Sequence, residues 1–251
     1  MSAPQRDEAQ RTMGWLGELV RNWGPAIAAV LLIRAFIFEP FRIPSGSMLP
    51  TLLIGDQVLV TKYSYGIWLP WLNKELVDLG DPARGDIIVF RYPLDPRQNY
   101  IKRVVGIPGD HIRVVNNQIT LNGAVQERDY TGRYASFDDR CAERDTKHYV
   151  ELLDGLHHHV LTNTGFGSTL ANHPPRGSSQ REIVVPPGNV FVMGDNRDNS
   201  EDSRKWGFVR FDQIKGKARF VWLSWDSCAP PTEVIRTDRF FHDLYHPPEA
   251  L

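Results

Sequence analysis

Two serines and one lysine in this 251-residue sequence could together carry out covalent hydrolysis. Ser45 and Ser47 lie in the run FRIPSGSMLPTL, where prolines and a glycine predict an irregular, exposed backbone. Lys102 lies in YIKRVVGIPGD, whose first half predicts a β-strand. A lysine buried in a strand can lose its proton and then activate a serine hydroxyl, whereas an arginine stays charged.

Strand alternation does not decide whether Lys102 or its neighbour Arg103 is the buried basic residue. Tyr100 and Val104 share a face with Lys102, while Arg103 has apolar neighbours on the opposite face. From these residues alone, an exposed lysine and a turn-forming serine are a better interpretation than a catalytic pair.

Other motifs for enzymes and metal sites are missing or weak. The sequence contains no G-x-S-x-G, H-E-x-x-H or S-x-x-K motif, which disfavours α/β-hydrolases, zincins and penicillin-binding enzymes. The triplet His157, His158 and His159 is interpreted as a solvated loop, because adjacent strand residues cannot all face one ion. The run 195–204 is no EF-hand, because Arg197 occupies a ligand position and no glycine is sixth.

Short apolar runs separated by glycine, proline and aspartate indicate the elements that must position these groups. Their spacing predicts a mainly β, antiparallel domain. The strands are expected at 57–62, 86–92, 100–105, 111–115, 119–121, 183–185, 190–193 and 218–223. The predicted catalytic core comprises 42–110 and 182–227, interrupted by an insertion at 111–181. Within the insertion, the polar stretch 122–181 predicts a ribbon or loops, and the proline-containing tail 228–251 is expected to be irregular.

An apolar segment, 23–41, precedes the predicted core and predicts one membrane-spanning helix. Arg34 is compatible with a span, because its long side chain can carry the guanidinium to the lipid headgroups. The alternatives for this segment are a buried helix of a soluble protein and a cleaved signal peptide. Basic residues are more frequent before the segment than after it, which places 1–22 in the cytoplasm and the rest outside. Trp222 and Trp225 could contact the membrane interface, although a core position competes with that interpretation.

Charge and cysteine content limit the remaining function classes. The formal net charge of −1 gives no overall basic field, so a dedicated nucleic-acid binder is not expected. Cys141 and Cys228 match no metal-site spacing, and whether they pair is left open.

The blocks around these residues resemble the type I signal peptidases, which are membrane-anchored Ser/Lys proteases that remove signal peptides from exported proteins. The shared blocks follow an apolar span in the family's order. They are PSGSMLPTL, Gly55 with Asp56, RGDIIVF, YIKRVVGIPGD and GDNRDNSEDSRKWGFV. Together they extend over 23–223 apart from the insertion. This chain has one predicted span where some members have two, and Cys141 has no nearby cysteine partner of the kind some members carry.

The resemblance implies a role for each matching residue. Ser47 would be the nucleophile, Lys102 its general base, Ser45 an oxyanion-hole hydroxyl and Ser200 the hydroxyl that orients the lysine. Asp202 and Arg204 would form a supporting ion pair, although a turn network without chemistry is an equal alternative for them, and Gly194 and Asn199 match structural positions. The residues implied for the substrate pocket are Phe41, Ile43, Pro44, Met48, Leu52, Tyr100 and Ile101.

The resemblance also implies the substrate and the location. Signal-peptide-bearing precursors would be cleaved after a small-x-small motif, on the outer side of the bacterial cytoplasmic membrane, by a monomer in contact with lipid. Neither a metal nor an organic cofactor is expected. The alternatives are a specialised maturation peptidase for one secreted or conjugation protein, a soluble self-cleaving relative, and a membrane-tethered β-domain that binds partners without catalysis.

Overall fold

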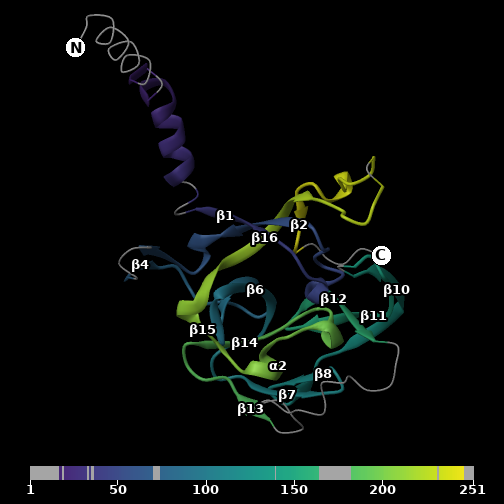
Figure 1. Ribbon diagram of the computed structural model, residues 1–251. Helices are drawn as coiled ribbons and strands as arrows, with labels where there is room; N and C mark the ends of the chain where they lie inside the picture. Colours follow the sequence, from purple (N-terminus) through teal and green to yellow (C-terminus); the bar gives the residue numbers. More distant parts are fainter. Residues whose placement is uncertain are drawn as a thin grey trace, which may run out of the picture.

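The computed structural model describes residues 17–18, 20–32, 34, 37–69, 74–138, 140–163, 182–230 and 232–245. Its largest sheet has eight strands, in the order β1-β2-β16-β5-β6-β14-β15, with β17 paired to β16. In Figure 1 this sheet runs from β1 and β2, at the top of the β-domain, down to β14 and β15. The strand bounds are β1 Phe38–Arg42, β2 Asp56–Thr61, β5 Ile87–Tyr92, β6 Asp95–Gly106, β14 Asn189–Met193, β15 Val209–Arg210, β16 Ile214–Ser224 and β17 His242–Asp243.

Three smaller sheets and several short helices complete the described structure. One sheet has the order β10-β11-β12, a second β13-β7-β8-β9 and a third β3-β4. Their bounds are β3 Gly66–Leu69, β4 Lys74–Asp78, β7 His111–Val115, β8 Gln118–Leu121, β9 Ala124–Val125, β10 Arg128–Phe137, β11 Glu143–Leu153, β12 Leu156–Asn163 and β13 Ile183–Val184. The short helices are Gly46–Met48, Lys62–Ser64, Arg197–Asn199, α2 Ser203–Trp206, Phe211–Gln213 and Thr237–Arg239.

The mainly β, antiparallel fold is confirmed. Each run predicted as a strand falls on a strand of the structure, and the paired strands of the main sheet are antiparallel. The predicted run 100–105, for example, forms the second half of β6. These runs combine β-branched residues with flanking turn residues, and both features are local, so the sequence alone reveals them.

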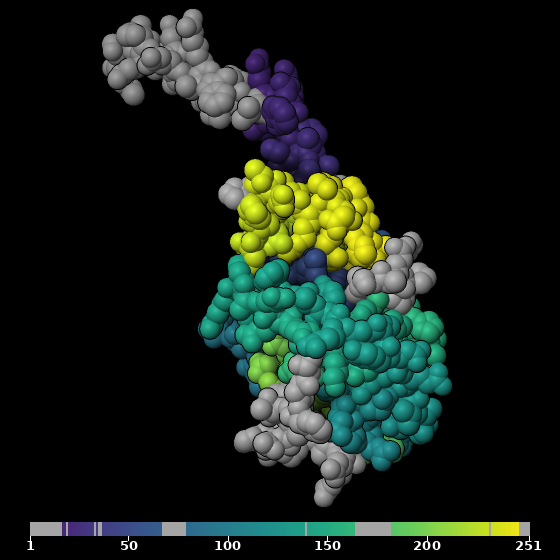
Figure 2. Space-filling model, turned by 90° about the vertical axis from the view of Figure 1, so that its right-hand side faces the viewer, coloured from purple at the N-terminus to yellow at the C-terminus, as the bar shows by residue number. Residues whose placement is uncertain are grey.

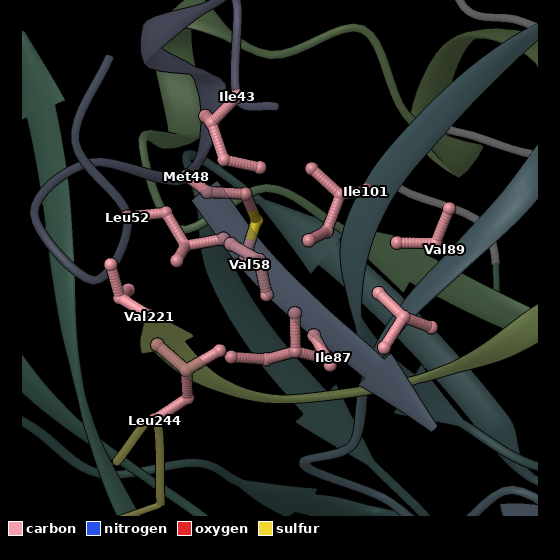
Figure 3. Close-up of a cluster of buried hydrophobic side chains, with 11 residues drawn as sticks. Ile43, Met48, Leu52, Val58, Ile87, Val89, Ile101, Val221 and Leu244 are labelled. Carbon is pink, nitrogen blue, oxygen red and sulfur yellow. The ribbon is translucent and has the colours of Figure 1, made fainter. Parts of the chain in front are cut away.

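The core fills both faces of the main sheet because consecutive strand residues point in opposite directions. On one face, β5 and β6 contribute Ile87 and Ile101 to a cluster that also holds Met48 and Leu52 (Figure 3). On the other face, Ile88 of β5 joins a separate apolar cluster with residues of β6 and β14. A polar side chain in the second half of β6, at 101–106, is therefore buried whichever way it points.

The predicted insertion is more regular than its polar composition indicates. Residues 111–125 include β7, β8 and β9, which pair in that order, and β7 also pairs with β13. The ribbon β10-β11-β12 extends to Asn163. The remainder, 164–181, lies outside the described residues. The prediction left a ribbon or loops open for this stretch, and the described part is a ribbon. Its exposed strands alternate polar and half-buried side chains, which accounts for the polar composition.

The prediction of an irregular tail is only partly correct. The tail includes a short helix and β17, and Leu244 joins the core cluster shown in Figure 3. Arg239 also forms an ion pair of 2.7 Å with Asp56. Cys228, at the start of the tail, forms a disulfide with Cys141 of the ribbon, which answers the question that the sequence left open.

The N-terminal segment is helical at residues 17, 18, 20–32 and 34. Figure 1 shows this helix, in purple, projecting from the β-domain, and its apolar side chains are exposed. Trp23, Ile27 and Val30 each have more than half of their surface accessible. The predicted span ends too late, because Phe38 already begins β1 and pairs with Thr61. Within the described residues, no helix combines the length and the apolar character that crossing a bilayer requires.

Candidate active site

Ser47 lies in a short helical turn that leaves β1 and packs against the segment after β14. Its backbone carbonyl accepts a hydrogen bond of 3.1 Å from the Asn196 N–H. The Asn196 side chain donates a second hydrogen bond, of 2.9 Å, to the carbonyl of Gly46. The turn that carries Ser47 is therefore fixed to the 194–204 segment, and its side chain is 8% exposed.

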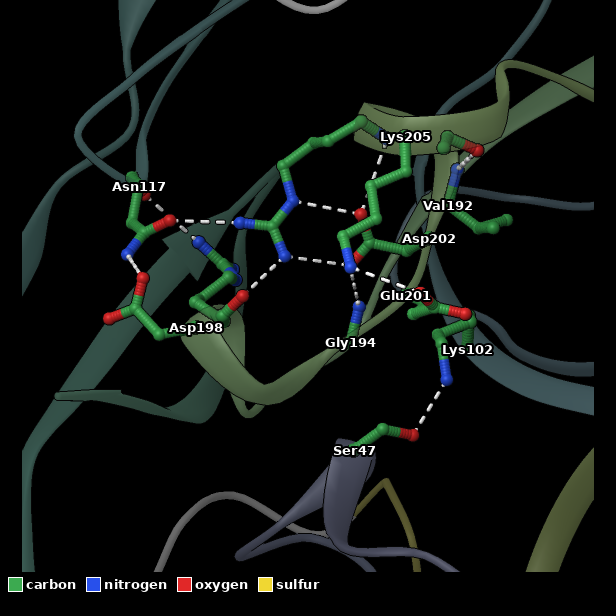
Figure 4. A network of polar contacts seen from close by, with 12 residues as sticks. Ser47, Lys102, Asn117, Val192, Gly194, Asp198, Glu201, Asp202 and Lys205 are labelled. Carbon is green, nitrogen blue, oxygen red and sulfur yellow. Dashed lines mark hydrogen bonds and ion pairs between the residues drawn. The ribbon is translucent and has the colours of Figure 1, made fainter. Parts of the chain in front are cut away.

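Lys102 extends from β6 toward Ser47, and the two side chains are in direct contact. The Lys102 Nζ donates a hydrogen bond of 2.6 Å to the Ser47 Oγ (Figure 4). Lys102 is 4% exposed, and its strand partner across β5 is the fully buried Ile88. Burial penalises the ammonium form and lowers the pKa of Lys102 to about 8, against the opposing effect of Asp202 and Asp195. An amine with this pKa can take the proton of a neighbouring hydroxyl near neutral pH.

Lys102 and Arg103 are both buried, on opposite faces of β6, so strand alternation could not single out one of them. Arg103 points to the opposite face and forms two hydrogen bonds with Asp195, of 2.8 and 2.7 Å. Asp195 also accepts a hydrogen bond of 2.6 Å from the Thr51 hydroxyl. A buried guanidinium stays charged and requires a paired carboxylate, which Asp195 supplies.

Asp202 and Arg204 form a buried ion pair beside this site. The Arg204 Nε and Nη2 contact the Asp202 carboxylate at 2.8 and 2.7 Å. Burial alone would raise the pKa of Asp202, but the Arg204 guanidinium and a hydrogen bond from the Gly194 N–H hold it below its ordinary value. The Arg204 Nη1 also donates a hydrogen bond of 2.8 Å to the Oδ1 of Asn117 (Figure 4). The carboxylate therefore stays ionised near Lys102.

Ser200 and Gly194 lie close to the Ser47 turn. A β-carbon placed on Gly194 would be 2.5 Å from the Ser47 carbonyl oxygen and 2.7 Å from the Ser200 Cβ, so this approach requires glycine. The Ser200 hydroxyl is buried near the Asp202 carboxylate, but it makes no hydrogen bond of full geometry within the described part of the chain. Asn199 ends the adjacent short helix and lines the cleft described next.

A cleft of about 1080 Å³ opens over Ser47 and Lys102. Ser45 is exposed, has an extended backbone and lines this cleft. Of the seven residues predicted for the substrate pocket, Pro44, Tyr100 and Ile101 line the cleft. The other four lie in or against the core cluster instead, because alternation in β1 and the turn after it directs them inward. They are Phe41, Ile43, Met48 and Leu52.

Asp195, Asn196 and the ribbon tip belong to the site but were not predicted from the sequence. Asp195 pairs with Arg103 of β6, and Asn196 holds the Ser47 turn. Both stand in the same sequence block as Ser200. A buried Arg103 needs a carboxylate partner, and this requirement could have identified Asp195. The ribbon tip, which lines the cleft with Phe137 and Arg144, gave no sequence signal, because its approach depends on tertiary packing.

The histidine triplet forms part of β12 rather than a solvated loop. His158 is buried beside Glu151, with 3.4 Å between its Nε2 and the carboxylate. His159 points to the other face and contacts the His148 Nε2 through its Nδ1 at 2.8 Å. Among the residues that the structure describes, no group of three or more histidine, cysteine or acidic side chains is arranged to hold a metal ion.

The known proteins that this chain resembles share one family name. The profile of the family described as "Signal peptidase, peptidase S26" matches residues 16–225. Signal peptidase I of Pseudomonas fluorescens is 42% identical over 225 residues, covering 84% of this chain and 73% of the relative. Signal peptidase I of Pseudomonas aeruginosa is 40% identical over 221 residues, with the same coverage. A solved signal peptidase I from Enterococcus faecalis matches at 24% identity with a TM-score of 0.30, covering 55% of this chain and 96% of that one. The chain therefore belongs to the peptidase S26 family of signal peptidases and is a serine protease of this type.

Proposed function

We propose that this chain removes signal peptides from precursor proteins with Ser47 as nucleophile and Lys102 as general base. The observation that carries the proposal is the 2.6 Å contact between the Lys102 Nζ and the Ser47 Oγ, made by a buried amine whose pKa is lowered to about 8. In the neutral form of the amine, the Ser47 hydroxyl donates to the Lys102 Nζ, which takes the proton as the Oγ attacks.

The two half-reactions then follow from the position of that proton. The Ser47 Oγ forms a bond to the scissile carbonyl carbon, and Lys102 protonates the leaving amine as the C–N bond breaks. The resulting ester is hydrolysed when neutral Lys102 accepts a proton from water and the hydroxide attacks the same carbon. The C–Oγ bond then breaks, and Lys102 returns the proton to the Ser47 Oγ. The exposed Ser45 hydroxyl lines the same cleft, where it can donate to the oxyanion together with the Ser47 N–H.

The neighbouring residues act by positioning these groups. In this proposal, the Ser200 hydroxyl limits rotation of the Lys102 amine, and the Asp202–Arg204 pair keeps the 194–204 segment in place. The close approach of Gly194 supports this arrangement, because the backbone carbonyl of Ser47 and the side chain of Ser200 meet at this one point. All of these groups come from one chain, so a monomer suffices for the reaction.

The cleft supports recognition of a small-x-small motif in an extended precursor segment. Pro44, Tyr100 and Ile101 give apolar walls next to Ser47, where alanine-sized side chains fit and larger ones overlap. The buried Ile43, Met48 and Leu52 pack in the same core cluster as Ile101, behind this wall, where they limit the depth of the pocket. They bear on specificity by filling the space that a larger substrate side chain would need.

We also propose that the N-terminal helix anchors the chain in the bacterial cytoplasmic membrane, with 1–22 cytoplasmic and the β-domain outside. The exposed apolar side chains Trp23, Ile27 and Val30 favour a lipid environment, because water solvates such a surface poorly. The Cys141–Cys228 disulfide is consistent with an oxidising compartment for the β-domain. Trp222 and Trp225, both exposed, could contact the same membrane surface.

The test is cleavage of a purified precursor with an A-x-A site. Ser47→Ala and Lys102→Met should each abolish product formation while the circular dichroism spectrum stays unchanged. Lys147→Met, at an exposed lysine outside the cleft, is the matched control and should cleave at the wild-type rate. Full activity of either site variant would reject the proposed pair, and unchanged precursor with the wild-type protein would reject the function.

A further inference from the structure

The cleft over Ser47 has a second wall, formed by the tip of the β10–β11 ribbon. Six residues of this wall carry charged or aromatic side chains: Phe137, Asp138, Arg140, Glu143, Arg144 and Asp145. The same cleft is also lined by Tyr100 and Ile101, which belong to β6. A polypeptide in the cleft therefore meets both the main sheet and the ribbon.

The ribbon is fixed to the rest of the protein at both ends. At its base, Arg197 forms a buried ion pair with Glu151 of β11. The Leu161 N–H of β12 also donates a hydrogen bond of 2.9 Å to the Asp195 carbonyl. At its tip, the disulfide joins Cys141 to Cys228 across a sequence separation of 87 residues. Figure 2 shows the C-terminal segment, in yellow, directly above the teal ribbon. The disulfide thus sets the distance between the ribbon tip and the β-domain.

The chemistry of this wall favours a polar polypeptide. Asp138 and Arg144 pair with each other at 2.8 Å, while Arg140 and Glu143 are exposed and form no ion pair with another described residue. Charges of both signs provide donors and acceptors for a chain of mixed composition. The apolar stretch of a signal peptide would instead strip water from these charges without replacing their hydrogen bonds, which is unfavourable.

We propose that the ribbon tip binds the polar, mature part of the precursor beyond the cleavage site, and that the Cys141–Cys228 disulfide holds this wall in its working position. The inference rests on the proposed function and names a second contact between enzyme and substrate. A ribbon contact outside the scissile region adds binding energy without changing the chemical step. Its loss should therefore raise KM for long substrates and leave kcat unchanged.

The experiment compares two substrates that share one signal peptide and one A-x-A site. The long substrate keeps the whole mature domain, and the short one ends a few residues after the site, before the ribbon. Two double variants are assayed: Cys141→Ser with Cys228→Ser, which releases the wall, and Phe137→Ala with Arg140→Ala, which keeps the disulfide. Arg113→Ala with Val125→Ala, at exposed residues outside the cleft, is the matched control.

Both ribbon variants should raise KM for the long substrate by about tenfold, the effect of one modest contact. Kinetics with the short substrate, and the pH dependence of the rate, should match the wild type. Equal loss with both substrates, or no loss with the long one, would overturn the inference. If the cysteine variant unfolds, the Phe137 and Arg140 variant decides alone. Failure of the wild type to cleave either substrate would reject the proposed function itself.

Discussion

Lys102 and Arg103 are consecutive residues of β6 that point to opposite faces of the sheet, and both are buried. Of these two residues, only Arg103 has a carboxylate of the described chain at ion-pair distance, the Asp195 side chain at 2.7 Å. Arg103 is therefore stabilised as a cation, whereas Lys102 is left with a hydroxyl partner and a lowered pKa. Consecutive positions of one strand thus hold a permanent cation on one face of the sheet and a titratable amine on the other.

The pH dependence of cleavage should follow the titration of Lys102. The amine must be neutral to accept a proton, and its pKa lies at about 8. The rate should therefore rise with pH through about 8 and fall about tenfold per unit well below it. Measuring kcat/KM from pH 5 to pH 10 with a fixed substrate checks this. A rate that is unchanged down to pH 5 would contradict a lysine base.

Lys102→Arg should be as inactive as Lys102→Met, although it keeps the positive charge. A guanidinium remains protonated at every pH of the assay and cannot act as a base. It would also be a second buried cation next to Arg103 without a carboxylate of its own. Product formation and thermal unfolding are measured together, so that loss of activity can be separated from loss of fold. Activity of the arginine variant would remove the argument for proton transfer by Lys102.

Much of the fold was predictable from sequence because its strands are encoded locally. The runs 86–92 and 41–52 each carry their own turn residues, so β5 and the turn at Ser47 could be predicted without knowing their neighbours. The predicted exposure of that turn is wrong, because Gly46, Ser47 and Met48 are buried by tertiary packing. The pairing of Lys102 with Ser47 was implied only by resemblance. Their contact joins segments 55 residues apart, and alternation alone does not place it.

The features that escaped prediction depend on tertiary contacts. The disulfide brings together Cys141 and Cys228, which are 87 residues apart, and two cysteines carry no information about their distance. Leu244 joins the core from a proline-containing tail with no strand pattern of its own. The burial of Ile43 and Met48 follows from how their turn packs on β6, so apolar type alone could not separate a pocket wall from the core.

Gly194→Ala should reduce cleavage strongly while leaving the protein folded. The new β-carbon would lie 2.5 Å from the Ser47 carbonyl oxygen, closer than packed atoms approach, so the Ser47 turn or the 194–204 segment must shift. A displacement of about 1 Å at a catalytic group can reduce the rate on the order of a hundredfold. Gly17→Ala, where an added β-carbon meets nothing within 4 Å, is the matched control and should keep full activity. A Gly194→Ala variant with a normal rate would show that this contact does not position Ser47.

Asp202→Ala should destabilise the protein more than removal of a surface charge. Asp202 is fully buried with Arg204, and losing the carboxylate leaves an unpaired buried guanidinium, which costs about 3 to 5 kcal/mol. Asp212→Ala breaks the exposed pair with Arg210 and should cost less than about 1 kcal/mol. Urea unfolding at pH 7 measures both values. Equal effects of the two substitutions would mean that the buried pair does not stabilise the 194–204 segment.

Glu151→Gln should weaken the base of the ribbon in a way that depends on pH. Burial alone would raise the pKa of Glu151, but the Arg197 guanidinium and His158 lower it to about 2 from an ordinary 4.5. A carboxyl whose folded pKa is lowered contributes stability above its unfolded pKa and loses it as pH falls through the folded value. The wild type should therefore be more stable than Glu151→Gln at pH 7, and the difference should shrink between about pH 4.5 and pH 2. Glu233→Gln, at an exposed glutamate, should show no such difference in urea unfolding. A stability gap for Glu151→Gln that is constant from pH 7 to pH 3 would contradict an ionised Glu151 as the partner of Arg197.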